Sequence, residues 1–425
     1  MTTPAGLGSA TEIPADLAAL QRRTLNSLRL SQIPGQAAVA ASVAVVTLLA
    51  SEMLGSDRWA GLGGAAMTIG AAVAAVPLAT AMRRRGRRPG LSAAFGIAAI
   101  GAVLAGAAGQ FSWFWLLIVG MFVFGSGQAA VLQSRYVATD LAPEHQRASA
   151  VAAIVWVGTL GAVVGPLMTP WSKGLARSMG LAELVGPYVV GAVLFAVAAV
   201  VVWVRLRPDP LRVIGGVDPA AAPGNPFGHV RTSLAEIRRA PLALLGLTVM
   251  AGSQAAMVAV MTMTPPHMKD HGHADLSAIV IAVHIFGMFG LAPVIGRFVD
   301  RIGAVSAAGW GAVVLGGGTV LSVVAGYVPA LMFVGLFLLG VGWSIGLISG
   351  TTLLTNGVAE PARVAAQGTS DLMMSLCGAV AAFGSGFVKD SLGFHILADA
   401  ATVLAGAMLV YAWYIRARQR RGLAV

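Results

Sequence analysis

The sequence predicts an all-helical protein that crosses a membrane many times. Of its 425 residues, 57% are hydrophobic and only 11% are charged, and the mean hydropathy is +0.80. A soluble domain carries about 25% charged residues. The hydrophobic residues also gather in long runs, and a run of roughly 20 apolar residues is long enough for a helix to cross a bilayer. Helices are expected because they satisfy their own backbone hydrogen bonds in lipid.

Twelve such runs are present, six in each half of the chain. The predicted spans are residues 36–55, 59–82, 91–109, 111–138, 148–170, 184–206, 241–264, 276–296, 304–326, 329–355, 368–388 and 391–415. Between the halves lies a polar segment rich in Pro and Gly, which we expect to be a linker ending in a short amphipathic helix. The expected domains are an N-terminal segment (1–35), a first six-helix bundle (36–206), the linker (207–240), a second six-helix bundle (241–415) and a basic tail (416–425).

The basic residues predict how the chain is oriented. An even number of spans places both termini on one side, and 23 of the 28 Lys and Arg residues fall on that side. Because positively charged loops stay in the cytoplasm, both termini are expected there. The same loops explain the net charge of +11, so no nucleic-acid partner is expected. Arg outnumbers Lys by 25 to 3, which favours a GC-rich bacterial genome and a location in the bacterial cytoplasmic membrane.

Two pairs of loops recur at nearly one spacing. ATAMRRRGRR (79–88) and GRFVDRIGAV (296–305) are 217 residues apart. DLAPEHQRASA (140–150) and VAEPARVAAQG (358–368) are 218 residues apart. Agreement in spacing and in membrane side indicates that the chain is a six-plus-six duplication.

The loop at 296–303 carries a family resemblance. Its sequence, GRFVDRIG, resembles the G-x-x-x-D-R-x-G signature of the major facilitator superfamily, at Gly296, Asp300, Arg301 and Gly303. The resemblance implies a monomeric transporter of twelve helices in two bundles. It also implies that Asp300 pairs with a basic group and with helix ends, as a latch that stabilises one transport state.

The first-half copy of this loop departs from the pattern. Ala79 replaces the first Gly and Arg83 stands at the Asp position, whereas Gly86 and Arg87 are retained. The latch is therefore expected mainly in the second half, or with another acid such as Asp140. A further segment, GTLGAVVGPLM (158–168), resembles part of the family's antiporter motif, at Gly161, Gly165 and Pro166.

Methionine and histidine side chains recur along residues 257–288. Met257 and Met261 are four residues apart and share a helix face, as do His284 and Met288 on the next span. At about 1.5 Å per residue, Met257 lies roughly 10 Å and His284 roughly 12 Å from the outer ends of their spans. The intervening outer loop is expected to add His267, Met268, His271 and His273 as recruiting side chains.

Thioether and imidazole ligands together favour copper(I). The M-x-x-x-M and H-x-x-x-M pairs resemble those of the CcoA-like copper importers, which implies that Met257, Met261, His284 and Met288 line a copper route. Met is also a common gap-filler in apolar helices, so ordinary packing stays open as the other interpretation. His284 is equally compatible with a proton relay.

Two acidic residues are candidates for proton coupling. Glu52 is expected near the outer end of the first span and Asp371 near the start of the eleventh. A buried carboxylate can hold a proton at neutral pH. Asp371 is also well placed to cap a helix N-terminus, and this interpretation is the favoured one.

The predicted function is transport of a small solute, with copper import as the first hypothesis. Proton-coupled efflux of a small organic compound or drug is the alternative, and a sensor with a transporter fold is a third. An enzyme is not expected, because no nucleophile elbow, phosphate loop or zinc-helix motif stands in a suitable context. No cofactor is expected, and the partners are the lipid bilayer and the solute.

Overall fold

The computed structural model describes residues 15–54, 62–219, 226–270, 272, 276–325 and 328–421. It confirms the all-helical fold. The helices of the first half are α1 (Ala15–Leu54), α2 (Leu62–Arg85), α3 (Arg87–Phe111), α4 (Phe114–Val137), η2 (Glu144–Gln146), α5 (Arg147–Leu167), α6 (Thr169–Ser178), η3 (Glu183–Val185) and α7 (Gly186–Arg205). Those that follow are α8 (Pro210–Val213), α9 (Pro226–Arg239), α10 (Pro241–Asp270), α11 (Ser277–Phe289), α12 (Ala292–Ile302), α13 (Ala304–Ala325), α14 (Pro329–Gly357), α15 (Glu360–Leu392) and α16 (Phe394–Arg420).

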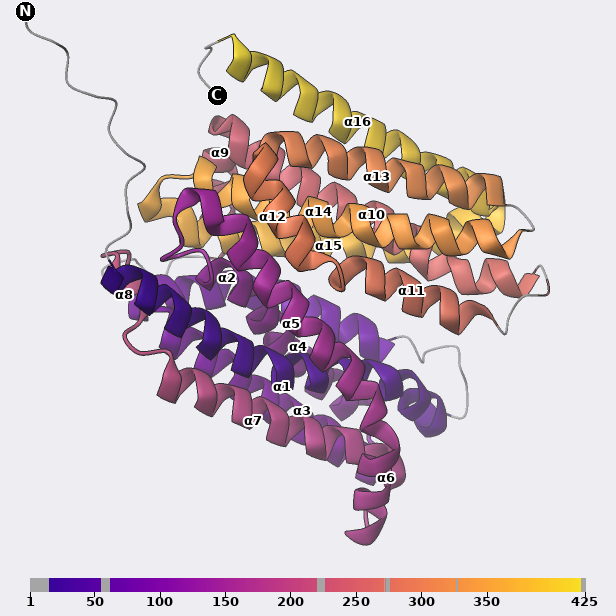
Figure 1. Cartoon of the computed structure of the whole chain (residues 1–425). Coiled ribbons are helices and arrows are strands. Elements are labelled where there is room, and N and C mark those ends of the chain that lie inside the picture. The colour runs from indigo at the N-terminus through magenta and orange to yellow at the C-terminus, as the bar shows by residue number, and fades with distance from the viewer. Residues whose placement is uncertain are drawn as a thin grey trace, which may run out of the picture.

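The long helices lie side by side in two groups (Figure 1). α1 to α7 form the lower group and α10 to α16 the upper one. One hydrophobic core is drawn almost entirely from residues 28–217, and another mainly from residues 243–408. The start of α1 and the end of α16 lie at the same end of the molecule, which we call the terminus side.

Within the described residues, eleven helical segments are long and apolar enough to cross a membrane. They do not include α1, a 40-residue helix that contains most of the predicted first span. The predicted span 276–296 is formed by two helices, α11 and α12, and continues to residue 302. The break precedes Pro293, which has no N–H with which to continue the helical hydrogen bonds.

The outer loop expected after residue 264 begins later than predicted. α10 continues through Pro265 and Pro266 to Asp270, so His267 and Met268 lie on a helix. The His267 ring stacks on Phe394 with the centroids 4.2 Å apart, and Met268 is buried. The predicted span ended at residue 264, so α10 is six residues longer than predicted at this end. His271 and His273 lie outside the described residues.

The two halves pack closely near the terminus side. α2 lies against α15, and α5 lies against α12. Two glycines allow the approach: a Cβ at Gly368 of α15 would lie 2.4 Å from the Ala79 side chain, and one at Gly296 of α12 would lie 2.5 Å from that of Ala152. Any larger residue at either position would push the halves apart.

Candidate functional site

A cavity of about 960 Å³ lies between the two halves. α1, α2, α4 and α5 supply one wall, and α10, α11, α14 and α15 supply the other. The lining runs from Arg135, near the terminus-side end of α4, to Gly64 and Ala65 at the opposite end of α2. Ligand pockets are about 300–1,000 Å³ in volume, so the cavity is large enough for a small organic molecule.

The cavity wall combines amide and aromatic side chains. Gln32 and Gln128 line it, and within the described part of the chain neither side-chain carbonyl oxygen has a hydrogen-bond partner. Gln254 accepts a 2.7 Å hydrogen bond from the indole N–H of Trp343, which fixes the orientation of the indole. Trp343 meets Phe289 edge to face, with ring centroids 5.7 Å apart. Because an unpaired buried carbonyl oxygen costs free energy, the two amides suit a ligand that donates N–H or O–H groups.

A buried ion pair joins the halves at the terminus-side end of the cavity. The Arg135 guanidinium contacts the Asp371 carboxylate, and the exposed fractions of the two side chains are 3% and 2%. Arg135 also donates to the Thr351 hydroxyl at 3.2 Å, and the Tyr136 hydroxyl lies 2.9 Å from that of Ser370. Among the described residues, the second carboxylate oxygen of Asp371 has no partner.

The position of Asp371 corrects one expectation. α15 begins at Glu360, so Asp371 lies well inside the helix and does not cap its N-terminus. Glu52, the other acidic candidate, is exposed at the end of α1 and does not line the cavity.

The second-half loop reaches across to the first half. Asp300 accepts hydrogen bonds from the backbone N–H groups of Ala148, at 3.2 Å, and Ser149, at 3.0 Å, and the Ser149 hydroxyl also donates to it. These N–H groups belong to the first turn of α5, where they have no helical carbonyl to bond. Asp300 therefore caps α5 from the opposite half.

The first-half loop makes a different contact. Arg87 is fully buried and donates to both carboxylate oxygens of Asp140, at 2.8 and 3.0 Å. The same guanidinium donates to the Gln367 side-chain carbonyl of α15 at 2.8 Å. Burial raises the pKa of the Asp140 carboxyl, and the contact with Arg87 opposes this rise. Arg83, at the position that matches the second-half aspartate, instead pairs with Asp218 of the linker at 3.2 Å.

The remaining residues of the two loops shape turns or face outward. Gly86 has φ +103° and Gly303 has φ +84°, a backbone conformation that favours glycine. Arg301 is exposed. Asn356 of α14 accepts from Arg147 and donates to Glu144 at 3.2 Å, which adds to the contacts between the halves on this side.

The predicted soft ligands divide between the cavity and the packed interior. Met257 and Met288 line the cavity from α10 and α11, whereas Met261 is half-buried and packs against the second core. His284 is fully buried, and its Nδ1 lies 2.8 Å from the Leu336 carbonyl oxygen. Among the described residues, no group of three or more His, Cys, Asp or Glu side chains is placed to hold a metal ion.

The helix-5 motif residues have a packing role in this structure. A Cβ at Gly161 would lie 2.5 Å from the Ile33 carbonyl oxygen, and one at Gly165 would lie 2.4 Å from that of Ala37. Pro166 lies in the last turn of α5. The two glycines thus let α5 pack directly against the backbone of α1.

The family model of the Major Facilitator Superfamily matches residues 33–382. The chain belongs to this superfamily. It is a membrane-embedded secondary transporter of a small solute, and it is not an enzyme. The predicted transport of a small solute by a membrane protein is therefore confirmed.

Relatives and solved structures agree with this assignment. An uncharacterised major-facilitator transporter of Bacillus subtilis, YdeG, is 37% identical over 97% of this chain and 96% of its own length. The riboflavin transporter RfnT of Brucella anthropi is 27% identical over 88% of this chain and 91% of its own. The human organic anion transporter MFSD10 has the same fold, with a TM-score of 0.76, 16% identity, and coverage of 92% of this chain and 99% of that one. These relatives lend no support to the resemblance to copper importers.

Sequence reasoning missed several residues of the cavity. The four glutamines, Gln32, Gln36, Gln128 and Gln254, were not singled out, and neither was Trp343. Polar amides are uncommon in apolar spans, and this was the signal that could have identified them.

Proposed function

We propose that this protein carries a small, largely planar organic solute with N–H and carbonyl groups across the bacterial cytoplasmic membrane. The supporting observation is that one cavity combines the fixed indole of Trp343 with two amide oxygens, on Gln32 and Gln128, that have no hydrogen-bond partner among the described residues. A planar ring stacks on the indole face, while its polar edge donates to the amides. Riboflavin, named for one relative, belongs to this class of molecule.

The cavity is exposed alternately to each side as the two halves rock. With the termini in the cytoplasm, the contacts of Asp300 and Arg87 close the cytoplasmic side. The structure then corresponds to a state that faces outward. Asp300 and Arg87 are the latch of this state.

The first test measures binding to the purified protein in detergent. Riboflavin and lumichrome are expected to raise the thermal unfolding temperature, and glucose, which is not planar, is expected to leave it unchanged. Trp343→Ala is expected to raise the Kd for the planar compounds about tenfold, equivalent to about 1.4 kcal/mol. The matched control is Trp413→Ala, which removes an exposed indole on α16.

Two results would contradict the proposal. The first is an unfolding temperature that no planar compound raises. The second is an equal loss of binding in Trp413→Ala, because that residue does not line the cavity.

The coupling proton is assigned to Asp371 rather than to Glu52. Among the described residues, one Asp371 carboxylate oxygen has no partner, and the other contacts Arg135, which belongs to the other half and lines the cavity. Protonation of this carboxyl removes the charge that holds Arg135, so it weakens a bond between the halves. The ion pair of Arg135 and Asp371 then links the movement of the solute to the movement of the proton.

Copper is the second candidate substrate, and one observation favours it. Since a carbonyl can only accept, His284 donates from Nδ1 to Leu336, and in the neutral imidazole this leaves an unprotonated Nε2. Among the described residues that Nε2 has no hydrogen-bond partner. Metal-ligating histidines commonly use this arrangement, in which a carbonyl fixes the tautomer. Met288 lies one helical turn further along α11 and reaches the cavity.

Copper(I) uptake into proteoliposomes under reducing conditions tests this candidate. If copper is the substrate, uptake is saturable and falls at least about tenfold in His284→Ala and in Met257→Ala/Met288→Ala. Met179→Ala, which removes an exposed methionine, is expected to leave uptake unchanged. Uptake no greater than in liposomes without protein would show that these side chains serve packing and the organic cavity instead.

A further inference from the structure

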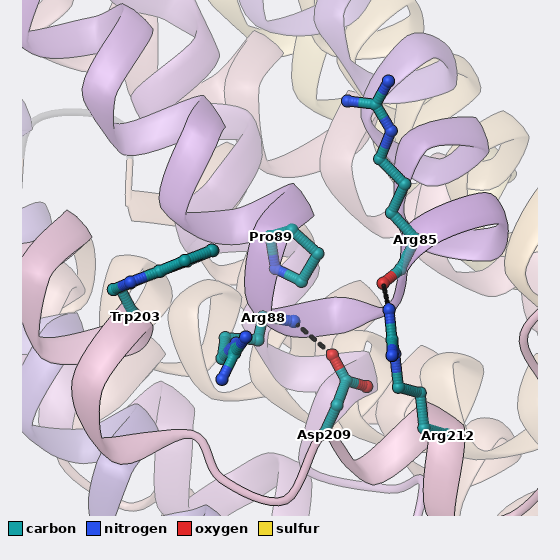
Figure 2. A pocket seen from close by; sticks show the side chains of 6 residues that line it. All are labelled: Arg85, Arg88, Pro89, Trp203, Asp209 and Arg212. Carbon is teal, nitrogen blue, oxygen red and sulfur yellow. Dashed lines mark hydrogen bonds between the residues drawn. The ribbon is translucent and has the colours of Figure 1, made fainter.

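A second pocket, of about 320 Å³, lies on the terminus side of the first half (Figure 2). Residues from the α2–α3 turn, the end of α7 and the start of the linker form it. They are Arg85, Arg88, Pro89, Trp203, Asp209 and Arg212. The transport mechanism proposed above makes no use of this pocket.

Two guanidinium groups of the pocket, those of Arg88 and Arg212, form no ion pair with a carboxylate of the described residues. The Arg88 guanidinium lies 4.5 Å from the centroid of the Trp203 ring, and Arg212 donates to the Arg85 carbonyl oxygen at 3.0 Å. The Asp209 carboxylate is engaged by backbone N–H groups, at 2.7 Å from Arg88 and 3.0 Å from the first turn of α8. Within the described part of the chain it forms no ion pair with either guanidinium. In Figure 2 the Arg85 side chain points away from the others.

An apolar surface leads into the pocket from the membrane. α3 and α7 pack against each other, and each has a row of exposed aliphatic side chains. On α7 this row consists of Val193, Val197, Val200 and Val204, and on α3 of Ile97, Ile100 and Val103. Both rows face lipid, and Trp203, which is 46% exposed, stands where the α7 row meets the pocket. Tryptophan is enriched at this depth, where the acyl chains give way to headgroups.

We propose that the pocket binds the phosphate group of an anionic phospholipid of the cytoplasmic leaflet, with its acyl chains along the α3–α7 surface. Guanidinium groups bind phosphate oxygens through paired N–H donors. Basic pockets between helices on the cytoplasmic side are suited to anionic headgroups. A lipid is favoured over a soluble phosphate because the aliphatic rows continue from the pocket, and a phosphate ion has no apolar part with which to cover them. The bound headgroup joins the start of the linker to the first half.

Native mass spectrometry of the full-length protein with added phosphatidylglycerol or phosphatidylcholine tests this site. The wild type is expected to retain phosphatidylglycerol at least about tenfold more strongly than phosphatidylcholine. Arg88→Gln/Arg212→Gln, which removes both charges and keeps amide donors, is expected to lose this preference. Arg88→Lys/Arg212→Lys is expected to retain part of it. All variants are compared at equal monodispersity in size-exclusion chromatography.

A matched control comes from the other half. Arg416→Gln/Arg420→Gln removes two exposed guanidinium groups beside exposed aromatic residues on α16, and no change in lipid preference is expected. An equal loss in this control, or an unchanged preference in the Arg88/Arg212 variant, would overturn the proposal. So would displacement of phosphatidylglycerol by millimolar inorganic phosphate, which would indicate a site for soluble phosphate.

Discussion

Arg135→Ala is expected to lower the free energy of unfolding by about 3–5 kcal/mol, because it leaves the Asp371 carboxylate buried without its cation. Transport is expected to be lost as well, since the ion pair that joins the halves is gone. Replacement of both partners, in Arg135→Met/Asp371→Leu, is expected to restore most of the stability and none of the transport. Denaturant titration in detergent micelles measures the stability.

The control for this experiment is the exposed pair of Arg177 and Glu183. Their side chains are 65% and 52% exposed and 3.6 Å apart, so Arg177→Ala is expected to cost under about 1 kcal/mol. If Arg135→Ala is no less stable than Arg177→Ala, the carboxyl of Asp371 is already protonated in the folded protein, and it is not an ion-pair partner.

Gly368→Val is expected to shift the protein away from the state seen here. The new side chain would meet Ala79 at the contact between α2 and α15, where even a Cβ alone at residue 368 would lie 2.4 Å from the Ala79 Cβ. Overpacking of this kind costs about 1–3 kcal/mol, which changes the ratio of two conformations about 5- to 150-fold. Spin labels at residues 84 and 360, in a Cys377→Ala background, are expected to report a longer distance between α2 and α15.

Gly384 provides the control on the same helix. A Cβ there would meet nothing within 4 Å, so Gly384→Val is expected to leave the spin-label distances unchanged. Identical distance distributions in Gly368→Val and the wild type would mean that the close contact at Gly368 does not hold the terminus side shut.

The sequence predicted the fold because the fold depends on local properties. Hydropathy marks each span without reference to its neighbours, and the loop at Asp300 identified the family. The helix ends were harder to predict. The seventh span was predicted to end at residue 264, whereas α10 continues to Asp270; His267 in this extension stacks on Phe394, a contact that is formed only in the folded protein.

The site was predicted only in part, for a related reason. Asp371 was predicted as a candidate, but its partner Arg135 lies 236 residues away in the sequence, and their pairing depends on how the halves dock. The methionines and the histidine were predicted from their spacing of four residues within one helix. Gln32 and Gln128 lie on different helices, so no spacing along the sequence relates them. A cavity built from single residues on eight helices leaves no local pattern.

The two contacts proposed as the latch differ between the halves. Ser149 and Gln367 are 218 residues apart and occupy matching positions, and each bonds to a loop of the other half. Ser149 donates to a carboxylate, whereas Gln367 accepts from a guanidinium, so the polarity of the bond is reversed. The Ser149 hydroxyl and the Gln367 amide can each donate and accept, so the reversal comes from the ionised groups, Asp300 and Arg87. The halves therefore meet on this side through one carboxylate, supplied by the second half, and one guanidinium, supplied by the first.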